Sequence, residues 1–340
     1  MNNILCFGEI LLRLNPKDYK RFFQAESFDI SFAGSEANVA VMLSNLGLDV
    51  SFFSSITNNE IGQSAINSLR KYGVGTNVIL RDNHRLGVYY VEMGYSQRPS
   101  KVIYDRKFSG IAQLEINDIN WDQLFDNTNW FHFSGITPAL SENLENICEV
   151  ACIEAKKRNI TISFDLNYRS QLWDFKKANN VFKKLLNYVD LCICNEEDLL
   201  KFFSDENEAC SENFKEIDHE GYVDLIDSIF SNYKFKHLAV TLRESISANE
   251  NNWSGIISDG KACLISNKYK INVLDRIGAG DSFAAGIIFS LLNNYSLEKS
   301  VNFATAASCL KHAIYQDFNI VSENEIFSLM QGNDDGRIKR

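Results

Sequence analysis

From residue 129 onward the sequence alternates short apolar runs with longer segments of helical periodicity, and this alternation constrains the fold more than any other feature. Strands that alternate with helices of about 10 to 15 residues are typical of a parallel sheet covered by helices on both faces. Strands are predicted at residues 4–7, 50–54, 130–133, 160–165, 191–194 and 237–242. Helices are predicted at residues 35–46, 61–72, 142–157, 176–186, 222–233, 279–292 and 297–312. The pattern therefore predicts an α/β fold with a large parallel sheet.

Two segments, residues 11–32 and 87–104, break this rhythm because they are extended and rich in β-branched and aromatic residues. Residues 87–93 and 101–104 are expected to be strands joined by a polar turn. We interpret both segments as a small β-sheet beside the main domain, either a lid or a plain extension of its edge. The predicted divisions are a core of residues 1–10, 33–86 and 107–325, a β-lid of residues 11–32 and 87–106, a surface insertion at 204–220, and a C-terminal tail at 326–340, frayed from 332.

Charge and composition exclude several classes of protein. The net charge is −10, from 44 acidic and 34 basic side chains, whereas general nucleic-acid or membrane-surface binders need a basic field. The N-terminus has no basic region or cleavage signal, and no run of about 18 apolar residues is present. The eight cysteines lack the spacing of a zinc site or a disulfide framework. These features predict a cytoplasmic protein with buried, reduced thiols.

The strongest chemical signal is the segment Asp275-Arg-Ile-Gly-Ala-Gly-Asp281, which leads directly into a predicted apolar helix. Small residues allow backbone N–H groups to approach a ligand, and a helix N-terminus adds partial positive charge. Gly278, Ala279 and Gly280 are therefore candidates for an anion hole, where transition-state charge would be stabilised. Asp281 is either a cap of the helix or a base that takes a proton from an alcohol. Neither a Walker loop nor a GxGxxG turn is present, so a plain NAD-dependent enzyme is excluded.

This segment resembles the GAGD signature of the ribokinase/PfkB-type carbohydrate kinases, and the stretch that runs from Gly34 to Ala40 resembles their N-terminal glycine motif. The resemblance covers about residues 3 to 325. It implies a three-layer αβα Rossmann-like core with a small β-sheet lid. It also implies that ATP phosphates lie against the anion hole while the lid covers the sugar.

Within this family the sequence is most similar to kinases of 2-keto-3-deoxygluconate, in the stretches that begin at Gln97, Phe164, Val240 and Lys311. Arg106 and Arg169 fall in these stretches, and a carboxylate substrate calls for a guanidinium. The resemblance implies the following sugar-site residues: Gly34, Asn38, Tyr89, Tyr104, Arg106, Ile136, Asn167, Arg169 and Asp281. Taken alone, the tyrosines could be lid packing, the arginines surface charges, and Asn167 a turn residue.

For the nucleotide, the resemblance places adenine between residues 241–245 and the helix near residues 304–308. The implied nucleotide-site residues are Asn195, Thr241, Arg243, Ser245, Gly278, Gly280 and Ser308. No direct metal ligand is expected, but Asn195 and Asp198 would organise Mg²⁺ through water. Two positions depart from the family pattern. Asp198 stands where a glutamate is usual, and Arg276, where a threonine is usual, either points outward or helps to neutralise phosphate.

The expected reaction is ATP-dependent transfer of a phosphoryl group to the terminal primary hydroxyl of 2-keto-3-deoxygluconate, with Asp281 as the base. One alternative is another sugar kinase of this fold, of the fructokinase or ribokinase type. A second is a regulator that binds sugar or nucleotide without catalysis, although a regulator would not need Asp281. An apolar lid face would be costly to leave in water, so a homodimer through the lid is also expected.

Overall fold

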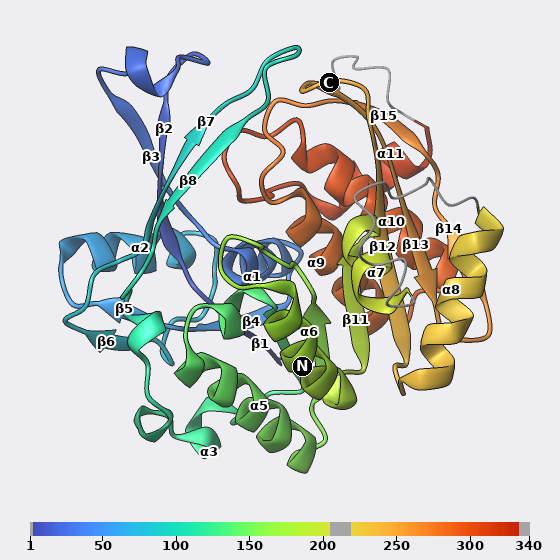
Figure 1. Ribbon diagram of the computed structural model, residues 1–340, viewed down its shortest axis with the longest axis horizontal. Helices are drawn as coiled ribbons and strands as arrows, with labels where there is room; N and C mark the ends of the chain where they lie inside the picture. The colour runs from blue at the N-terminus through green and yellow to red at the C-terminus, as the bar shows by residue number, and fades with distance from the viewer. Residues whose placement is uncertain (1–2, 205–218, 333–340) are drawn as a thin grey trace.

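The computed structural model describes residues 3–204 and 219–332, and Figure 1 shows two parts, a large core and a small sheet that projects from it. The core contains a sheet of nine strands in the order β14-β13-β12-β11-β10-β9-β1-β4, with β15 paired to β13. The strands are β4 (Asp49–Phe53), β1 (Asn3–Phe7), β9 (Trp130–Ser134), β10 (Thr161–Asp165), β11 (Leu191–Asn195), β12 (His237–Ser245), β13 (Glu250–Ser258), β14 (Cys263–Ile265) and β15 (Tyr269–Asn272).

The sheet is mixed, which corrects the expectation of a wholly parallel one. From β4 to β12 neighbouring strands are parallel, as predicted, but β13 pairs antiparallel with β12, β14 and β15. None of the strands after residue 245 was predicted. This edge runs through Ser and Asn residues at 245–254, so it lacks the continuous apolar run that marks a strand buried on both faces.

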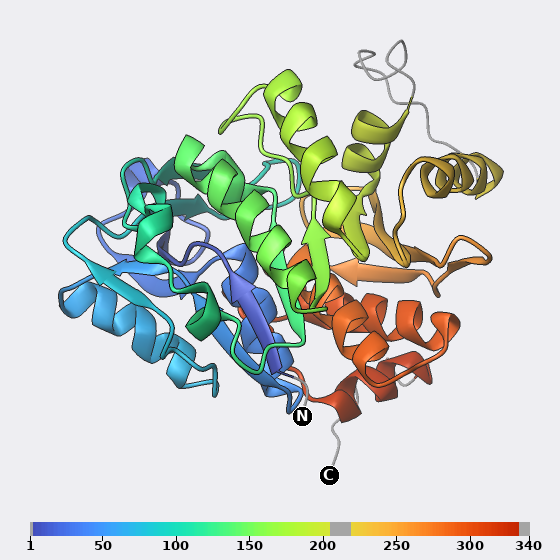
Figure 2. The ribbon, with the colours of Figure 1, turned by 90° about the horizontal axis from the view of Figure 1, so that it is seen from below.

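Helices cover both faces of the sheet, as Figure 2 shows. Strand residues alternate between two apolar clusters: Phe131 and Phe133 belong to one, while Trp130 belongs to the other. The first face is covered by α3 (Trp121–Leu124), α5 (Glu142–Lys157), α6 (Phe175–Leu185), α7 (Glu196–Phe203) and α8 (His219–Asn232). The second is covered by α1 (Ser35–Asn45), α2 (Glu60–Arg70), α9 (Ala279–Leu292), α10 (Leu297–Lys311) and α11 (Glu323–Met330).

The projecting sheet has the order β3-β2-β7-β8 and confirms the predicted small β-sheet. Its strands are β2 (Leu11–Pro16), β3 (Phe28–Ala33), β7 (Val88–Glu92) and β8 (Lys101–Asp105). The central pair, β2 and β7, is parallel, and both outer pairs are antiparallel. We call this sheet the lid. Shorter elements complete the chain: β5 (Ser55–Thr57), β6 (Leu80–Asp82), α4 (Ile136–Ala139), and four 3₁₀ turns at Phe22–Gln24, Ile111–Gln113, Ile116–Asp118 and Leu186–Tyr188.

One boundary is corrected at the C-terminal end. The predicted tail began at residue 326, but α11 spans that position and Ile326 is fully buried in the core. Ser322 and Glu325 form a capping box at the start of α11, in which the Ser322 hydroxyl accepts from the backbone N–H of Glu325. The spacing of a serine three residues before a glutamate is the sequence signal that indicates this helix. The expected insertion at 204–220 and the frayed end from 332 fall almost wholly outside the described residues.

Two expectations about composition can be compared with the structure. Cys6, Cys148, Cys152, Cys192 and Cys194 are buried, and none of the cysteines in residues 3–204 and 219–332 is part of a disulfide. Within the same ranges, no helix combines the length and the apolar character that crossing a bilayer requires.

Candidate active site

A cavity of about 410 Å³ lies between the lid and the carboxyl ends of the central strands. Asp165 at the end of β10 and Asn195 at the end of β11 border it, together with the first turn of α9 and with Tyr89 of the lid. Ligand sites in open α/β sheets form outside the carboxyl ends of the strands, so the cavity lies where the topology favours a site.

The segment 278–281 forms a backbone cradle at one wall of this cavity. Gly278 is the N-cap of α9, in the left-handed region with φ of 88°. A Cβ on Gly278 would overlap the carbonyl oxygen of Asp317, so both its torsion and its surroundings require glycine. A Cβ on Gly280 would instead meet no protein atom within 4 Å. The Ala279 N–H makes a long bond of 3.3 Å to the Arg276 carbonyl, while the N–H groups of Gly280 and Asp281 have no helical carbonyl to bond. This turn stands beside open space that an anion can enter.

Asp281 is nearly buried, with 8% of its surface exposed, but its carboxylate borders the cavity. One oxygen accepts a hydrogen bond of 2.6 Å from the Asn38 amide, and the other accepts one of 2.7 Å from the Ser35 hydroxyl. Burial raises the pKa of Asp281 to about 6, and these two hydrogen bonds oppose the rise. The carboxylate is therefore mostly ionised at neutral pH and can accept a proton from a neighbouring alcohol.

The N-terminus of α1 holds this carboxylate in place. Gly34 packs so closely on the carbonyl oxygen of Glu9 that a Cβ would overlap it. Asn167, with φ of 39°, donates from its amide to the Ser35 hydroxyl at 2.9 Å. A chain of hydrogen bonds thus runs from Asn167 through Ser35 to Asp281, and it fixes the orientation of the carboxylate.

The two arginines expected at the sugar site occupy different environments. Arg106 is buried and ion-paired with Glu9, with 2.7 Å between Nε and Oε2, and its guanidinium lies 5.2 Å from the centroid of the Tyr104 ring. Arg169 borders the cavity, is exposed, and within the described residues forms no ion pair. Arg169 is therefore the guanidinium available to a carboxylate, while Arg106 is already neutralised.

The lid contributes a pair of stacked rings, Tyr89 and Tyr104, whose centroids lie 5.8 Å apart. Tyr89 is buried and donates from its hydroxyl to a carboxylate oxygen of Asp317 at 2.6 Å. Tyr104 is 41% exposed. Both rings and Ile136 border the cavity, so the structure brings together every residue expected at the sugar site.

The nucleotide-site residues are only partly brought together. Asn195, Thr241, Arg243 and Arg276 border the cavity, and Arg276 also donates to the Ala248 carbonyl at 2.7 Å, so it does not point outward. Ser245 and Ser308 do not border it.

These two serines lie away from the cavity in two different settings. The Ser308 hydroxyl is buried and donates to the Ala279 carbonyl at 2.7 Å, which supports the cradle from behind. Ser245 is exposed at the end of β12, which continues three residues beyond the predicted strand.

Several cavity residues were missed in the sequence. Asp317 borders the cavity and lies in the stretch after Lys311 that carries the family resemblance, but no role was predicted for it. Other missed residues that border the cavity include Glu9, Ser35, Asp165, Trp253 and His312. Asp165 ends a predicted strand, the usual position of a functional side chain in such sheets, and this was the signal that could have found it. Burial and the neighbouring Asp281 raise its pKa well above the usual value for aspartate.

The expected Mg²⁺ organisers bond to each other. Asn195 caps α7 by accepting from the backbone N–H of Asp198 at 2.7 Å, and its amide donates to the Asp198 carboxylate at 3.1 Å. Asp198 also accepts from the backbone N–H of Tyr168 and does not border the cavity. Among residues 3–204 and 219–332, no group of three His, Cys, Asp or Glu side chains could hold a metal ion.

A Rossmann-like sheet with a β-lid, a backbone cradle and a carboxylate at a helix N-terminus defines the class of ribokinase-like sugar kinases. Residues 1–313 match the model of the pfkB family of carbohydrate kinases. The chain belongs to this family and is a carbohydrate kinase.

Relatives of known structure or name support this assignment. The solved structure of a 2-dehydro-3-deoxygluconokinase from Thermotoga maritima is 43% identical, with a TM-score of 0.93, over 98% of this chain and 100% of that one. A PfkB family carbohydrate kinase from Listeria grayi is 32% identical, with a TM-score of 0.89, over 97% and 100% of the two chains. A 2-dehydro-3-deoxygalactonokinase from Haloferax volcanii is 28% identical over 98% of each chain.

Proposed function

We propose that this kinase transfers the γ-phosphoryl group of ATP to the terminal primary hydroxyl of 2-keto-3-deoxygluconate, giving the 6-phosphate. The observation that carries the proposal is the Asp281 carboxylate, which is oriented by Asn38 and Ser35 and borders the cavity beside the cradle of α9. Asp281 accepts the hydroxyl proton as the sugar oxygen attacks, and the N–H groups from Ala279 to Asp281 stabilise the charge on the migrating group.

The acidic sugar is favoured by Arg169, because an exposed guanidinium at the cavity has no partner in a neutral hexose. The name of the Thermotoga maritima relative, 2-dehydro-3-deoxygluconokinase, refers to the same compound as 2-keto-3-deoxygluconate. We propose that Arg169 binds the sugar carboxylate, and that Tyr89, Tyr104 and Arg106 form the wall against which the sugar chain lies.

For the donor, we propose that Thr241, Arg243 and Arg276 bind ATP on the side of the cavity away from the lid tyrosines. Bound Mg²⁺ would neutralise charge on the β and γ phosphates. Its water shell would contact Asp165 and Asn195, the oxygen-bearing side chains at the ends of β10 and β11. Carboxylate and amide oxygens are acceptors that suit the water shell of Mg²⁺. An enzyme that consumes ATP and a metabolic acid fits a cytoplasmic location.

A second candidate substrate is 2-keto-3-deoxygalactonate, because the Haloferax volcanii relative carries the name of that activity. The two acids differ only in the orientation of one hydroxyl group. Both retain the carboxylate for Arg169 and the terminal hydroxyl for Asp281.

An ADP-release assay with both keto-deoxy acids, gluconate, fructose and ribose tests the proposal. The highest kcat/KM is expected for one of the two keto-deoxy acids. A higher value for fructose or ribose would instead support a fructokinase or ribokinase type of enzyme. Binding of sugar and ATP without any turnover would support a non-catalytic regulator.

We also propose that two copies associate through their lids. The lid exposes large apolar side chains, with Ile30 63% and Ile103 49% exposed, and such a surface is costly to leave in water. Light scattering at micromolar concentration should report a dimer, and Ile30→Lys should shift it toward the monomer; a wild-type monomer contradicts the proposal.

A further inference from the structure

The lid strand β2 buries its polar face. Leu11, Arg13 and Asn15 alternate with the half-buried Leu12 and Leu14, and the Arg13 side chain has no exposed surface at all. A buried guanidinium is costly unless its charge and its donors are matched by partners. Arg13 must therefore be explained by what it meets inside the protein.

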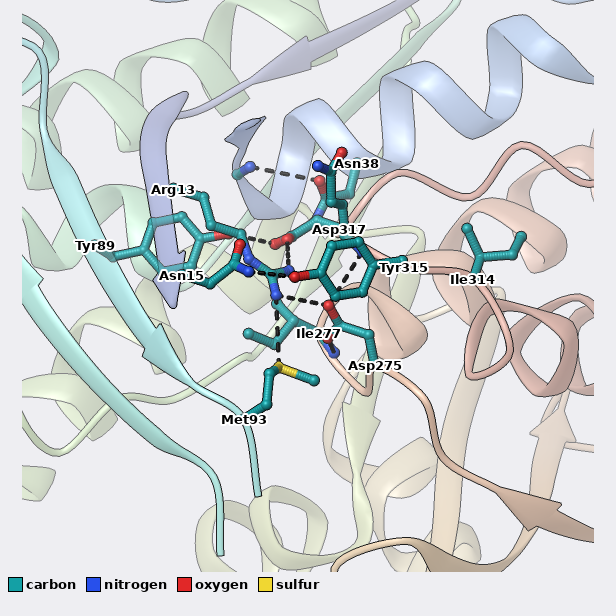
Figure 3. A network of polar contacts seen from close by, with 12 residues as sticks. Arg13, Asn15, Asn38, Tyr89, Met93, Asp275, Ile277, Ile314, Tyr315 and Asp317 are labelled. Carbon is teal, nitrogen blue, oxygen red and sulfur yellow. Dashed lines mark hydrogen bonds and ion pairs between the residues drawn. The ribbon is translucent and has the colours of Figure 1, made fainter. Parts of the chain in front are cut away.

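Arg13 meets two carboxylates of the core, as Figure 3 shows. One terminal nitrogen donates to Asp275 at 2.6 Å, and the other donates to Asp317. Both carboxylates are buried, with 0% and 3% exposure. Arg13 thus joins the lid to two core loops, one around Asp275 and one around Asp317, both more than 260 positions away from it in the sequence.

The first loop leads into the backbone cradle at 278–281, and the second packs against it. Asp275 accepts hydrogen bonds of 3.1 Å from the backbone N–H of Ile277, next to Gly278, and from that of Gln316. The carbonyl of Asp317 packs so tightly on Gly278 that no Cβ would fit between them. The positions of both aspartates therefore determine the conformation of the turn that leads into α9.

The charges in this cluster balance only when Arg13 is present. Lys311, also fully buried, donates to the Ile314 carbonyl at 3.1 Å and lies 3.5 Å from the Asp275 carbonyl. Two aspartates thus face two cations, of which only Arg13 comes from the lid. Without Arg13, two buried carboxylates would repel each other beside Gly278, with a single ammonium to offset them.

We propose that Arg13 is a positioning residue for phosphoryl transfer, which holds Asp275 and Asp317 together and thereby keeps the backbone cradle at 278–281 in shape. Tyr89 of β7 adds a second bond from the lid to Asp317, at 2.6 Å. Placement of the lid over the sugar and the geometry of the anion hole are then coupled through the same two carboxylates. The inference rests on the proposed role of this cradle in catalysis.

The test compares Arg13→Met, Arg13→Lys and a control, Asn15→Ala, with the wild type. Asn15 lies on the same buried face of β2 and bonds Tyr315, but it touches neither aspartate. All variants are assayed with the sugar that the wild type phosphorylates fastest. If the proposed substrate is wrong, the wild-type assay reveals it, and the comparison among the variants remains valid. Arg13→Met is expected to lower kcat about 100-fold, comparable to the loss of an oxyanion-hole donor, with KM for sugar and ATP changed less than about threefold.

A second measurement separates positioning from general damage. Binding of ADP with aluminium fluoride, Mg²⁺ and sugar imitates the transition state, so Arg13→Met should weaken it far more than it weakens binding of ATP. If Arg13→Met does not fold, Arg13→Lys decides, because lysine keeps the charge but cannot span both carboxylates; its kcat is expected to fall about tenfold. A wild-type kcat in the folded variant, a change confined to KM, or an equal loss of kcat in Asn15→Ala overturns the proposal.

Discussion

Asn38 and Asp281 lie in two different helices of the core and share a hydrogen bond of 2.6 Å. Because Ser35 bonds the second oxygen of the same carboxylate, Asp281 is fixed at the mouth of the cavity instead of turning back to cap its own helix. Burial raises the pKa of Asp281, and the hydrogen bond from Asn38 lowers it again in part. Asn38 and Ser35 therefore set the direction of the proposed base, and they oppose the effect of burial on its proton affinity.

Asp281→Asn should abolish most turnover while leaving ligand binding nearly intact. The amide keeps the size of the side chain but cannot accept the hydroxyl proton, so kcat is expected to fall about 10²- to 10⁴-fold. Steady-state kinetics with calorimetric binding of sugar and ATP checks this. Near-wild-type turnover would contradict the role of Asp281 as base.

The pH dependence of kcat should show an acid limb near pH 6. Asp281 acts only when ionised, and its pKa is raised to about 6, so activity should fall as pH drops through that value. Ser35→Ala removes a hydrogen bond that lowers this pKa, so the limb should move to higher pH. An acid limb near pH 4 in the wild type, or no shift in the variant, would count against the assignment.

Gly280→Ala and Gly278→Ala should separate turnover from stability. A Cβ on Gly280 meets only open space, so the variant should keep its Tm, but the methyl group would crowd the anion and lower kcat. Gly278→Ala combines a positive φ with overlap on Asp317, so its stability should fall by about 1 kcal/mol or more. Thermal unfolding and kinetics on both variants provide the comparison, and equal Tm losses would refute it.

The two arginines should behave differently when replaced by methionine. Arg169→Met removes an exposed charge at the cavity, so KM for the acidic sugar should rise while Tm stays constant. Arg106→Met leaves the buried carboxylate of Glu9 without its cation, which should cost about 3 to 5 kcal/mol of stability. Because both arginines border the cavity, either variant can lose activity, so thermal unfolding is measured together with the kinetics. Stable Arg106→Met protein would show that the Glu9 pair is dispensable.

Much of the core and of the site could be predicted, because their signals are local. The range of α5 was predicted to the residue, and so was that of α9, since both carry helical periodicity between clear ends. The cradle at 278–281 follows from glycines before an apolar helix, which is a property of neighbouring residues. The antiparallel edge β13–β15 was missed because β14 and β15 have only three and four residues, and the nine-residue β13 begins with the polar run from Glu250 to Asn252.

By itself, the sequence determined the alternating α/β core, the small lid sheet and the place of Asp281 at a helix N-terminus. Only the tertiary structure decided which charges pair: Arg106 with Glu9, and Arg13 with Asp275 and Asp317. Periodicity predicts which face of a strand is buried, but it assumes that the buried face is apolar. On β2 the lid places Arg13 opposite two core carboxylates, and a pairing between residues more than 260 positions apart leaves no periodic trace in the chain.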